Sequence, residues 1–147
     1  MALLQLKQAW VKRAVSVAKQ CAERVAAGIQ HPQKEQSYQR ALAVELAIQG
    51  YLTSLEHPAP VVYKASNGCA TVLGHERIDV LATHAKLQWS FIIEVKRGGN
   101  ANMKAAKDQA IRYCRNLTVA GYPEMIAGIV VVFTDRAPRI ELAWTFA

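Results

Sequence analysis

The sequence FIIEVKRGG at positions 91–99 begins as a buried strand and ends in charged residues. Because successive strand side chains point to opposite faces, Glu94 and Lys96 share a face and Val95 points away from it. A second acid, Asp79, stands in the preceding apolar segment RIDV. Carboxylates hold Mg²⁺ in phosphate-processing sites, and a lysine orients water or offsets developing negative charge. The pattern therefore indicates metal-assisted phosphodiester hydrolysis, and the alternative is a solvated polar strand end.

The segment ERIDVLATHAKLQWSFIIEVK at positions 76–96 predicts a hairpin, because apolar residues alternate on both sides of a central turn. A turn centred at positions 86–87 places Asp79 opposite Glu94 and Arg77 opposite Lys96. Two directly opposed carboxylates repel each other and destabilise a sheet. We therefore expect a cation between Asp79 and Glu94, provided that the register is correct.

The two faces of this hairpin differ in character. One face is expected to be wholly apolar and comprises Ile78, Val80, Ala82, Trp89, Phe91, Ile93 and Val95. The other carries the charged residues together with Leu81 and Ile92, which indicates that it is covered. A covered carboxylate without a partner is costly. We therefore expect Asp79, Glu94 and the backbone carbonyl of Val95 to bind Mg²⁺, for which Mn²⁺ could substitute.

Hydrophobic periodicity defines the elements that must position these residues. Helices are expected at 3–29, 34–49 and 101–119, and strands at 58–66, in the hairpin 76–96, at 126–134 and at 140–147. The order is α-α-β-β-β-α-β-β. It predicts an α/β fold with a mixed, largely antiparallel central sheet flanked by helices, formed by a single domain over residues 1–147.

The first helix has an apolar stripe from Leu3 and Leu6 to Ile29, and its other faces are rich in lysine and arginine. We expect a core-packing helix with a solvated basic face. The alternatives are a basic arm on nucleic acid, a transit-like segment and a helix that pairs with a partner protein.

The composition also limits the class of protein. Hydrophobic residues make up 52% and charged residues 20% of the chain, which argues against disorder. The net charge of +7 favours an anionic partner, of which nucleic acid is the commonest. In the third helix, phosphate contacts are one interpretation of the basic residues and a solvated face is the other; these residues are Lys104, Lys107, Arg112 and Arg115.

The remaining residue types indicate a location rather than a chemistry. The three cysteines are widely spaced and form no CxxC pair, so we expect neither disulfides nor zinc, and an intracellular, reducing compartment (cytoplasm or nucleus). No secretory signal and no bilayer-spanning apolar run is apparent. The four histidines lack ligand spacing and are expected at the surface or in loops.

RIDV followed by IIEVK resembles the PD-(D/E)xK nuclease superfamily, and the chain is most similar to its GxxExxY branch. The motifs that carry the resemblance are EQSY at 35–38, AL at 41–42, EL at 45–46, Gly50, Glu56, Pro58, Tyr63, RID at 77–79, EVK at 94–96, Gln109 with Tyr113, and GIVVVF at 128–133. The match spans residues 32–134, so the basic helix at 1–30 lies outside it. Pro32 replaces the leading glycine of GxxExxY, and the loop between Asp79 and Glu94 is longer than usual.

The resemblance implies a restriction-endonuclease-like core and a role for each matching residue. Asp79 and Glu94 would bind the divalent metal, and Lys96 would be the catalytic lysine. Glu35 would be the helical acid that completes the site, with Glu45 as the alternative. Gln109 would position water or phosphate. Tyr38 and Tyr113 are expected to be packing residues.

These observations predict a Mg²⁺-dependent nuclease that hydrolyses phosphodiester bonds of nucleic acid, most plausibly DNA, without strict sequence specificity. The leading alternative is a nuclease-like fold that binds nucleic acid, or assists another protein, without turnover. A homodimer or a larger assembly is compatible with both.

Overall fold

The structure of the chain is a computed structural model, which describes residues 2–64, 66–98, 102–121 and 124–146. Its elements are α1 (Ala2–Gly28), α2 (Glu35–Ile48), β1 (Tyr51–Lys64), β2 (Ala70–His84), β3 (Ser90–Arg97), α3 (Met103–Val119), β4 (Met125–Phe133) and β5 (Arg139–Thr145). Their order is the one predicted from the sequence. Residue 101, where the third helix was expected to begin, and Gly99 of the FIIEVKRGG segment lie outside the described residues.

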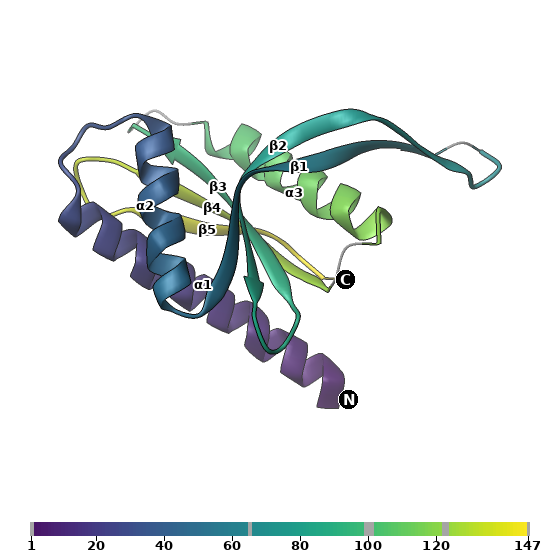
Figure 1. The fold of residues 1–147 in the computed structure, drawn as a ribbon, viewed down its shortest axis with the longest axis horizontal. Helices are drawn as coiled ribbons and strands as arrows, with labels where there is room; N and C mark the ends of the chain where they lie inside the picture. The colour runs from purple at the N-terminus through teal and green to yellow at the C-terminus, as the bar shows by residue number, and fades with distance from the viewer. Residues whose placement is uncertain (1, 65, 99–101, 122–123, 147) are drawn as a thin grey trace.

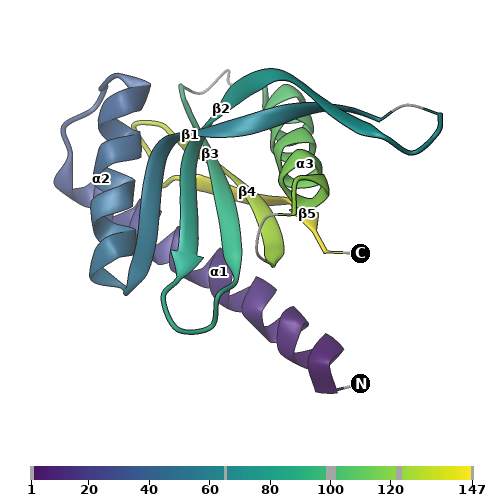
Figure 2. The same ribbon diagram turned by 45° about the vertical axis from the view of Figure 1, so that its right-hand side comes forward.

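The five strands form one sheet in the order β1-β2-β3-β4-β5. Only β3 and β4 are parallel, and α3 connects them as a crossover, since a parallel pair cannot be joined by a tight turn. Helices α1 and α2 cover one face of the sheet and α3 covers the other (Figures 1 and 2). The predicted mixed, largely antiparallel sheet flanked by helices is confirmed.

Each face of the sheet has its own apolar core. Under α1 and α2 the core includes Leu42 and the β3 side chains of Phe91, Ile93 and Val95. Under α3 it includes Leu81 and Ile92, so the prediction that the charged face is covered is confirmed. Gly128 of β4 lets α3 approach closely, because a Cβ atom there would lie 2.9 Å from Cys114 Sγ.

The pairing of β2 with β3 has the predicted register, from Val80 opposite Ile93 to Thr83 opposite Ser90. The residues of β2 before Val80 do not pair with β3. They pair with β1 alone, and the two strands form a ribbon that extends past the sheet (Figure 1). The prediction that Arg77 lies opposite Lys96 is therefore wrong, since the pairs of β2 with β3 run only from Val80 to Thr83.

Two further predictions about the ribbon are wrong. Ile78 packs in the core under α3 and not with Val80 and Ala82, because the strand has left the plane of the sheet at that point. The first strand begins at Tyr51 and not at residue 58. The polar residues Glu56 and His57 interrupt its apolar pattern, and this hides its first half in the sequence.

Helix α1 packs against the sheet from Val11 to Val25, so the expectation of a core-packing helix is confirmed. Its apolar stripe starts later than predicted, because the Leu3 and Leu6 side chains are exposed. No helix in the described part of the chain is long and apolar enough to cross a membrane.

All three cysteines have free thiols, and burial raises the pKa of Cys21 to about 11. A reducing compartment stays a prediction.

Candidate active site

Asp79 and Glu94 meet at the point where β2 separates from β3. The Val95 backbone N–H donates a hydrogen bond of 2.8 Å to Asp79 Oδ2. This bond forms because β2 has left the ladder at Val80, so the edge of β3 at Val95 is free of a strand partner. The side chain of Asp79 therefore takes the place of a backbone acceptor, and it holds its carboxyl beside that of Glu94.

Glu94 is almost completely buried, with an exposed fraction of 1%. One of its carboxyl oxygens, Oε1, has no hydrogen-bond partner among the described residues. Burial and the nearby Asp79 carboxylate raise the pKa of Glu94 to about 8. Buried, unpaired carboxyl oxygens are rare because their desolvation is costly, so this atom needs either a proton or a cation.

Helix α3 forms the cover over Glu94. The Glu94 carboxylate contributes, after burial, to raising the pKa of both Tyr113 and Cys114 on that helix. Tyr113 and Tyr38 are buried, which confirms that both are packing residues. The Gln109 side-chain amide donates a hydrogen bond of 2.7 Å to Tyr113 Oη. The side-chain oxygen of Gln109 is therefore available to accept a hydrogen bond from another group.

Electrostatic effects on Asp79 identify its other neighbours. Burial raises the pKa of the Asp79 carboxyl, the Val95 N–H and the Lys96 ammonium lower it, and the carboxylates of Glu35 and Glu56 raise it. Lys96 also lowers the pKa of Glu94. Lys96 thus lies close to both acids, although no salt bridge joins it to either of them.

A hollow of about 260 Å³ opens at this place between α2, β3 and α3. Glu35, Lys96 and Gln109 all line it, together with Arg97 and Asn102. The hollow brings together residues from three elements that are distant in sequence. It gives a substrate access to the ammonium of Lys96.

The two candidates for the helical acid occupy different environments. Glu35, the first residue of α2, lines the hollow beside Lys96. Glu45 lies three turns later, and its carboxylate is 3.8 Å from the guanidinium of Arg24 on α1. These positions are the basis on which Glu35, and not Glu45, is proposed below as the helical acid.

The residues around Asp79 fit a hard divalent cation that keeps part of its water shell. Within the described ranges, no three His, Cys, Asp or Glu side chains converge as they would in an all-protein metal cage. Mg²⁺ typically uses one or two carboxylates, together with waters and substrate oxygens. The Val95 carbonyl points to the same strand edge as its N–H and thus toward Asp79. Asp79, Glu94 and this carbonyl therefore form a suitable set of oxygen donors.

The predicted phosphate-binding residues of α3 are mostly engaged with acids. Lys104 pairs with Asp108 at 2.9 Å, and Lys107 pairs with Glu141 at 2.6 Å. Arg112 forms two hydrogen bonds, of 2.9 and 2.6 Å, with the carboxylate of Glu76 on the ribbon. The fourth, Arg115, is exposed and has no ion pair with a described residue. Nucleic acid would have to compete with these acids for three of the four cations.

Sequence reasoning assigned no role to Glu56 and Arg97. Glu56 lies on β1 between the residues that pair with Val80 and Ile78, which places it opposite Asp79. Its backbone is in the left-handed region, with φ of 53°, a strained conformation for a residue with a side chain. The only signal in the sequence was the position of Glu56 within the family motif.

The prediction that the histidines lie at the surface or in loops is confirmed for His75, which is exposed, and for His31, which lies in the loop between α1 and α2, but it is wrong for His57 and His84, which are half-buried in strands. His31 bonds to Tyr38 Oη and to the carbonyl of Ala26. His84 packs against Tyr51 and Trp89. These contacts join segments far apart in the chain, so histidine spacing alone did not reveal them.

Comparison of the chain with known proteins shows which family it belongs to. No curated protein matches the chain. Among solved structures, the chain is similar to Hjc, a Holliday junction resolvase from Archaeoglobus fulgidus, with 18% sequence identity and a TM-score of 0.47. The match covers 76% of this chain and 74% of the resolvase chain.

The family model described as the PD-(D/E)XK nuclease superfamily matches residues 12–140, which is most of the chain and includes Glu35, Asp79, Glu94, Lys96 and Gln109. The fold is accordingly of the restriction-endonuclease-like type. The finer assignment to the GxxExxY branch stays a prediction. The chain belongs to the PD-(D/E)XK nuclease superfamily.

Proposed function

We propose that this protein is a Mg²⁺-dependent nuclease that hydrolyses phosphodiester bonds of DNA without strict sequence specificity. The observation that carries the proposal is the adjacency of two carboxyl groups, Asp79 and Glu94, to Lys96, whose side chain in turn lines an open hollow. Membership of a nuclease superfamily supports the general activity. The metal, the kind of nucleic acid and the roles of the residues are our inference.

Asp79, Glu94 and the Val95 carbonyl would hold the cation. When bound, a divalent ion polarises the scissile phosphate and lowers the pKa of a coordinated water. The Val95 N–H fixes the Asp79 carboxylate through a hydrogen bond of 2.8 Å, so this oxygen needs little reorganisation. The Glu94 carboxyl must lose its proton before it can act as a ligand, since its pKa is about 8.

The other residues of the hollow would act directly on the substrate and on water. Lys96 offsets the negative charge that develops on the phosphate and helps to orient the attacking water. Glu35 lies within electrostatic range of Asp79 and accepts a hydrogen bond from that water. Gln109 contributes its side-chain oxygen as a further acceptor, because its amide nitrogen is bonded to Tyr113 Oη.

DNA is the proposed substrate, and the net charge of +7 favours binding of a polyanion. We propose cleavage without strict sequence specificity because no base-reading motif is evident in the chain. Mn²⁺ should substitute for Mg²⁺, as both accept oxygen ligands. A homodimer or larger assembly stays a prediction.

The test is a cleavage assay on labelled single-stranded DNA, duplex DNA and RNA, with Mg²⁺, Mn²⁺ or EDTA. Wild type is compared with Asp79→Ala and Lys96→Ala. Lys86→Ala serves as the matched control, because Lys86 is exposed in the turn between β2 and β3. We expect metal-dependent cutting of DNA that is lost in the two site variants and retained in the control.

Two results would contradict the proposal. Cutting that persists in both site variants would indicate a contaminant or a different site. Binding of DNA without cutting of any substrate would favour the alternative function, a non-catalytic nucleic-acid-binding or accessory protein. In that case Asp79→Ala should leave the affinity for DNA unchanged or raise it, because a negative charge near the phosphates is removed.

A further inference from the structure

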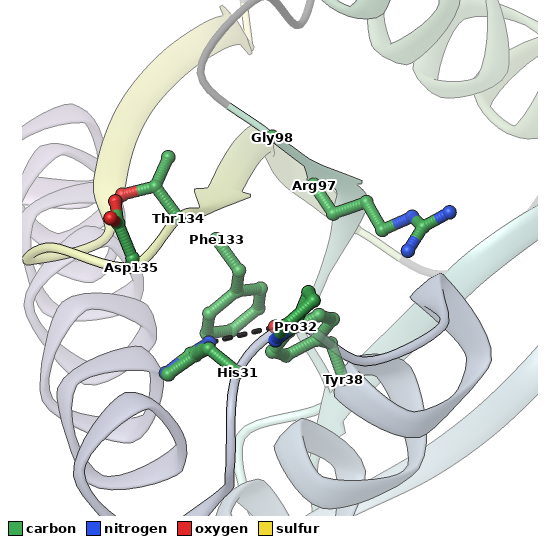
Figure 3. Close-up of a pocket in the computed structure, with 8 residues that line it drawn as sticks. All are labelled: His31, Pro32, Tyr38, Arg97, Gly98, Phe133, Thr134 and Asp135. Carbon is green, nitrogen blue, oxygen red and sulfur yellow. Dashed lines mark hydrogen bonds between the residues drawn. The ribbon is translucent and has the colours of Figure 1, made fainter.

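A second, larger hollow lies beside the candidate active site at the carboxyl ends of β3 and β4. Its volume is about 580 Å³, within the range of small-molecule binding sites. The segment between α1 and α2 closes one side, through His31 and Pro32 (Figure 3). None of the residues proposed for catalysis lines it.

The floor of this hollow is aromatic and rigid. The rings of Tyr38 and Phe133 stack with centroids 4.5 Å apart and planes 8° from parallel. Both side chains are almost fully buried, so they form a floor and do not move into solvent. The ring of His31 stacks on Tyr38 at 5.6 Å and, with exposed Pro32, gives the hollow an apolar wall.

Hydrogen bonds hold this wall in place. His31 Nε2 donates to the carbonyl oxygen of Ala26 at 3.0 Å, since a carbonyl can only accept. His31 Nδ1 then accepts from Tyr38 Oη at 2.7 Å (Figure 3). The backbone N–H of Gln33 donates to the same Tyr38 oxygen at 3.2 Å. The wall is therefore formed before any ligand binds.

The rim of the hollow is polar and carries one positively and one negatively charged side chain. Arg97 is fixed by a hydrogen bond of 3.0 Å from Nη1 to the carbonyl of Gln33. On the other side, Thr134 Oγ1 accepts from the backbone N–H of Arg136 at 3.0 Å, which leaves its hydroxyl proton available. The exposed carboxylate of Asp135 has no ion pair with any residue that the structure describes. Figure 3 shows Arg97 on one side of the hollow, with Thr134 and Asp135 on the other.

The two hollows are adjacent, because Arg97 lines both of them and directly follows Lys96. Lys96 and Gly98 lie about 7 Å apart along an extended chain. Because Arg97 lines both hollows, a nucleotide whose phosphate lies in the smaller one can place its base in the larger one. A base still paired in a duplex cannot do so, since its neighbours and its partner hold it in the stack.

We propose that this second hollow binds an unpaired nucleobase of the strand that is cleaved. This inference rests on the proposed function and names its substrate class: DNA with an unpaired nucleotide next to the scissile phosphate. A base fits because its faces are apolar and its edge carries N–H groups that can donate hydrogen bonds to the carboxylate of Asp135.

The test compares two short single-stranded DNA probes of equal length, one with all its bases and one fully abasic. Both carry the same phosphate charge, so a difference in affinity reports contacts to bases alone. Binding is measured in EDTA, which removes any contribution from cleavage. We expect wild type to bind the base-bearing probe about tenfold more tightly, as base stacking is sequence-tolerant and strong.

Two variants change the hollow in different ways. Thr134→Phe fills it and should bring the ratio of affinities close to one. Asp135→Asn keeps the size, removes the charge and should lower the ratio about threefold. Because Asp135 is exposed, this variant should fold even if Thr134→Phe does not. Lys86→Ala, in the distant turn, should bind both probes as wild type does.

The inference is overturned if wild type shows no preference for the base-bearing probe. It is equally overturned if folded Thr134→Phe and Asp135→Asn both keep the full preference, since the bases would then bind elsewhere. The same preparations are assayed for cleavage in Mg²⁺. Metal-dependent cutting without a base preference refutes this inference and leaves the nuclease function standing. A base preference that both variants reduce, without cutting of any DNA, refutes the nuclease function instead.

Discussion

A buried polar side-chain atom without a hydrogen-bond partner among the described residues lies at the amino end of β3, and another lies nearer its carboxyl end. The desolvation cost of the atom is offset differently at the two places. At the amino end, Trp89 Nε1 is such an atom. The Trp89 ring lies between aromatic neighbours: its centroid is 5.9 Å from Trp10, 5.3 Å from His84 and 5.8 Å from Tyr51. Burial of these rings stabilises the fold by more than one unmade hydrogen bond costs.

Nearer the carboxyl end the atom without a partner among the described residues is Oε1 of Glu94. This carboxyl avoids a buried charge by keeping its proton, as the raised pKa indicates. The comparison shows that one end of the strand contributes stability, whereas the other retains a costly group that a cation could use. Four substitutions can separate these two roles.

The largest effect is expected for Asp79→Asn. Asparagine can still accept the hydrogen bond from the Val95 N–H, but it loses the charge that would bind the metal. We expect cleavage to fall about 10³-fold, in line with the loss of one strong electrostatic group, while the melting temperature stays unchanged or rises. Steady-state cleavage rates and thermal melting of the same preparation provide the measurement. A variant that keeps its activity would exclude Asp79 as a ligand.

Trp89→Ala should have the opposite profile. Removing a fully buried indole should lower the free energy of unfolding by about 3–5 kcal/mol. The cleavage rate of the molecules that remain folded should change little, because Trp89 lies at the far end of β3 from Glu94. Urea unfolding and cleavage at low temperature test this. A large loss of activity with intact stability would show that the two ends are coupled.

Glu94→Gln should stabilise the metal-free protein, and by more at higher pH. The pKa of Glu94 is raised from 4.5 to about 8 on folding. Below pH 4.5, the pKa of this carboxyl in the unfolded chain, it is protonated in both the folded and the unfolded state, so its titration does not lower the stability. Between these two values only the folded state keeps the proton, so stability falls with pH by at most about 1.4 kcal/mol per unit. Glutamine removes this loss.

The comparison of Glu94→Gln with wild type is made in EDTA by denaturant unfolding over a series of pH values. The two proteins should be similar near pH 4, and the advantage of the variant should be greatest above about pH 8. Parallel stability curves for the two proteins would contradict the buried, protonated state of this carboxyl.

The smallest effect separates the two acids of α2. Glu35→Gln should lower cleavage about tenfold, a modest contribution to acid–base chemistry, because Glu35 lines the hollow beside Lys96. Glu45→Gln is the matched control: its carboxylate faces Arg24, and its loss should leave the rate unchanged. Kinetics of the two variants side by side decide between the acids. The reverse pattern would assign the role to Glu45.

Much of the fold followed from local patterns. The order of the elements and the register of β2 with β3 were predicted because apolar residues alternate on both strands around one turn. The register placed Asp79 next to Glu94, and the burial of Leu81 and Ile92 confirmed that this face is covered. Such features depend on periodicity, which a sequence displays directly.

Other features depend on tertiary geometry and left no periodic signal. The residues of β2 before Val80 do not pair with β3, which moved Arg77 away from Lys96 and freed the Val95 N–H for Asp79. The left-handed backbone conformation of Glu56 is a local feature that hydrophobic periodicity does not predict. The ion pair of Arg112 with Glu76 likewise joins two elements that are distant in sequence. Because of this ion pair, Arg112 is less available for a phosphate contact than the sequence suggested.

The most direct test of the central claim is Mn²⁺ binding, measured by calorimetry and electron paramagnetic resonance on wild type, Asp79→Asn and Glu94→Gln. We expect wild type to bind the ion at this site and each variant to lose most of the affinity. Glu45→Gln should bind as wild type does. Equal binding by all four proteins would show that Asp79 and Glu94 do not form a metal site.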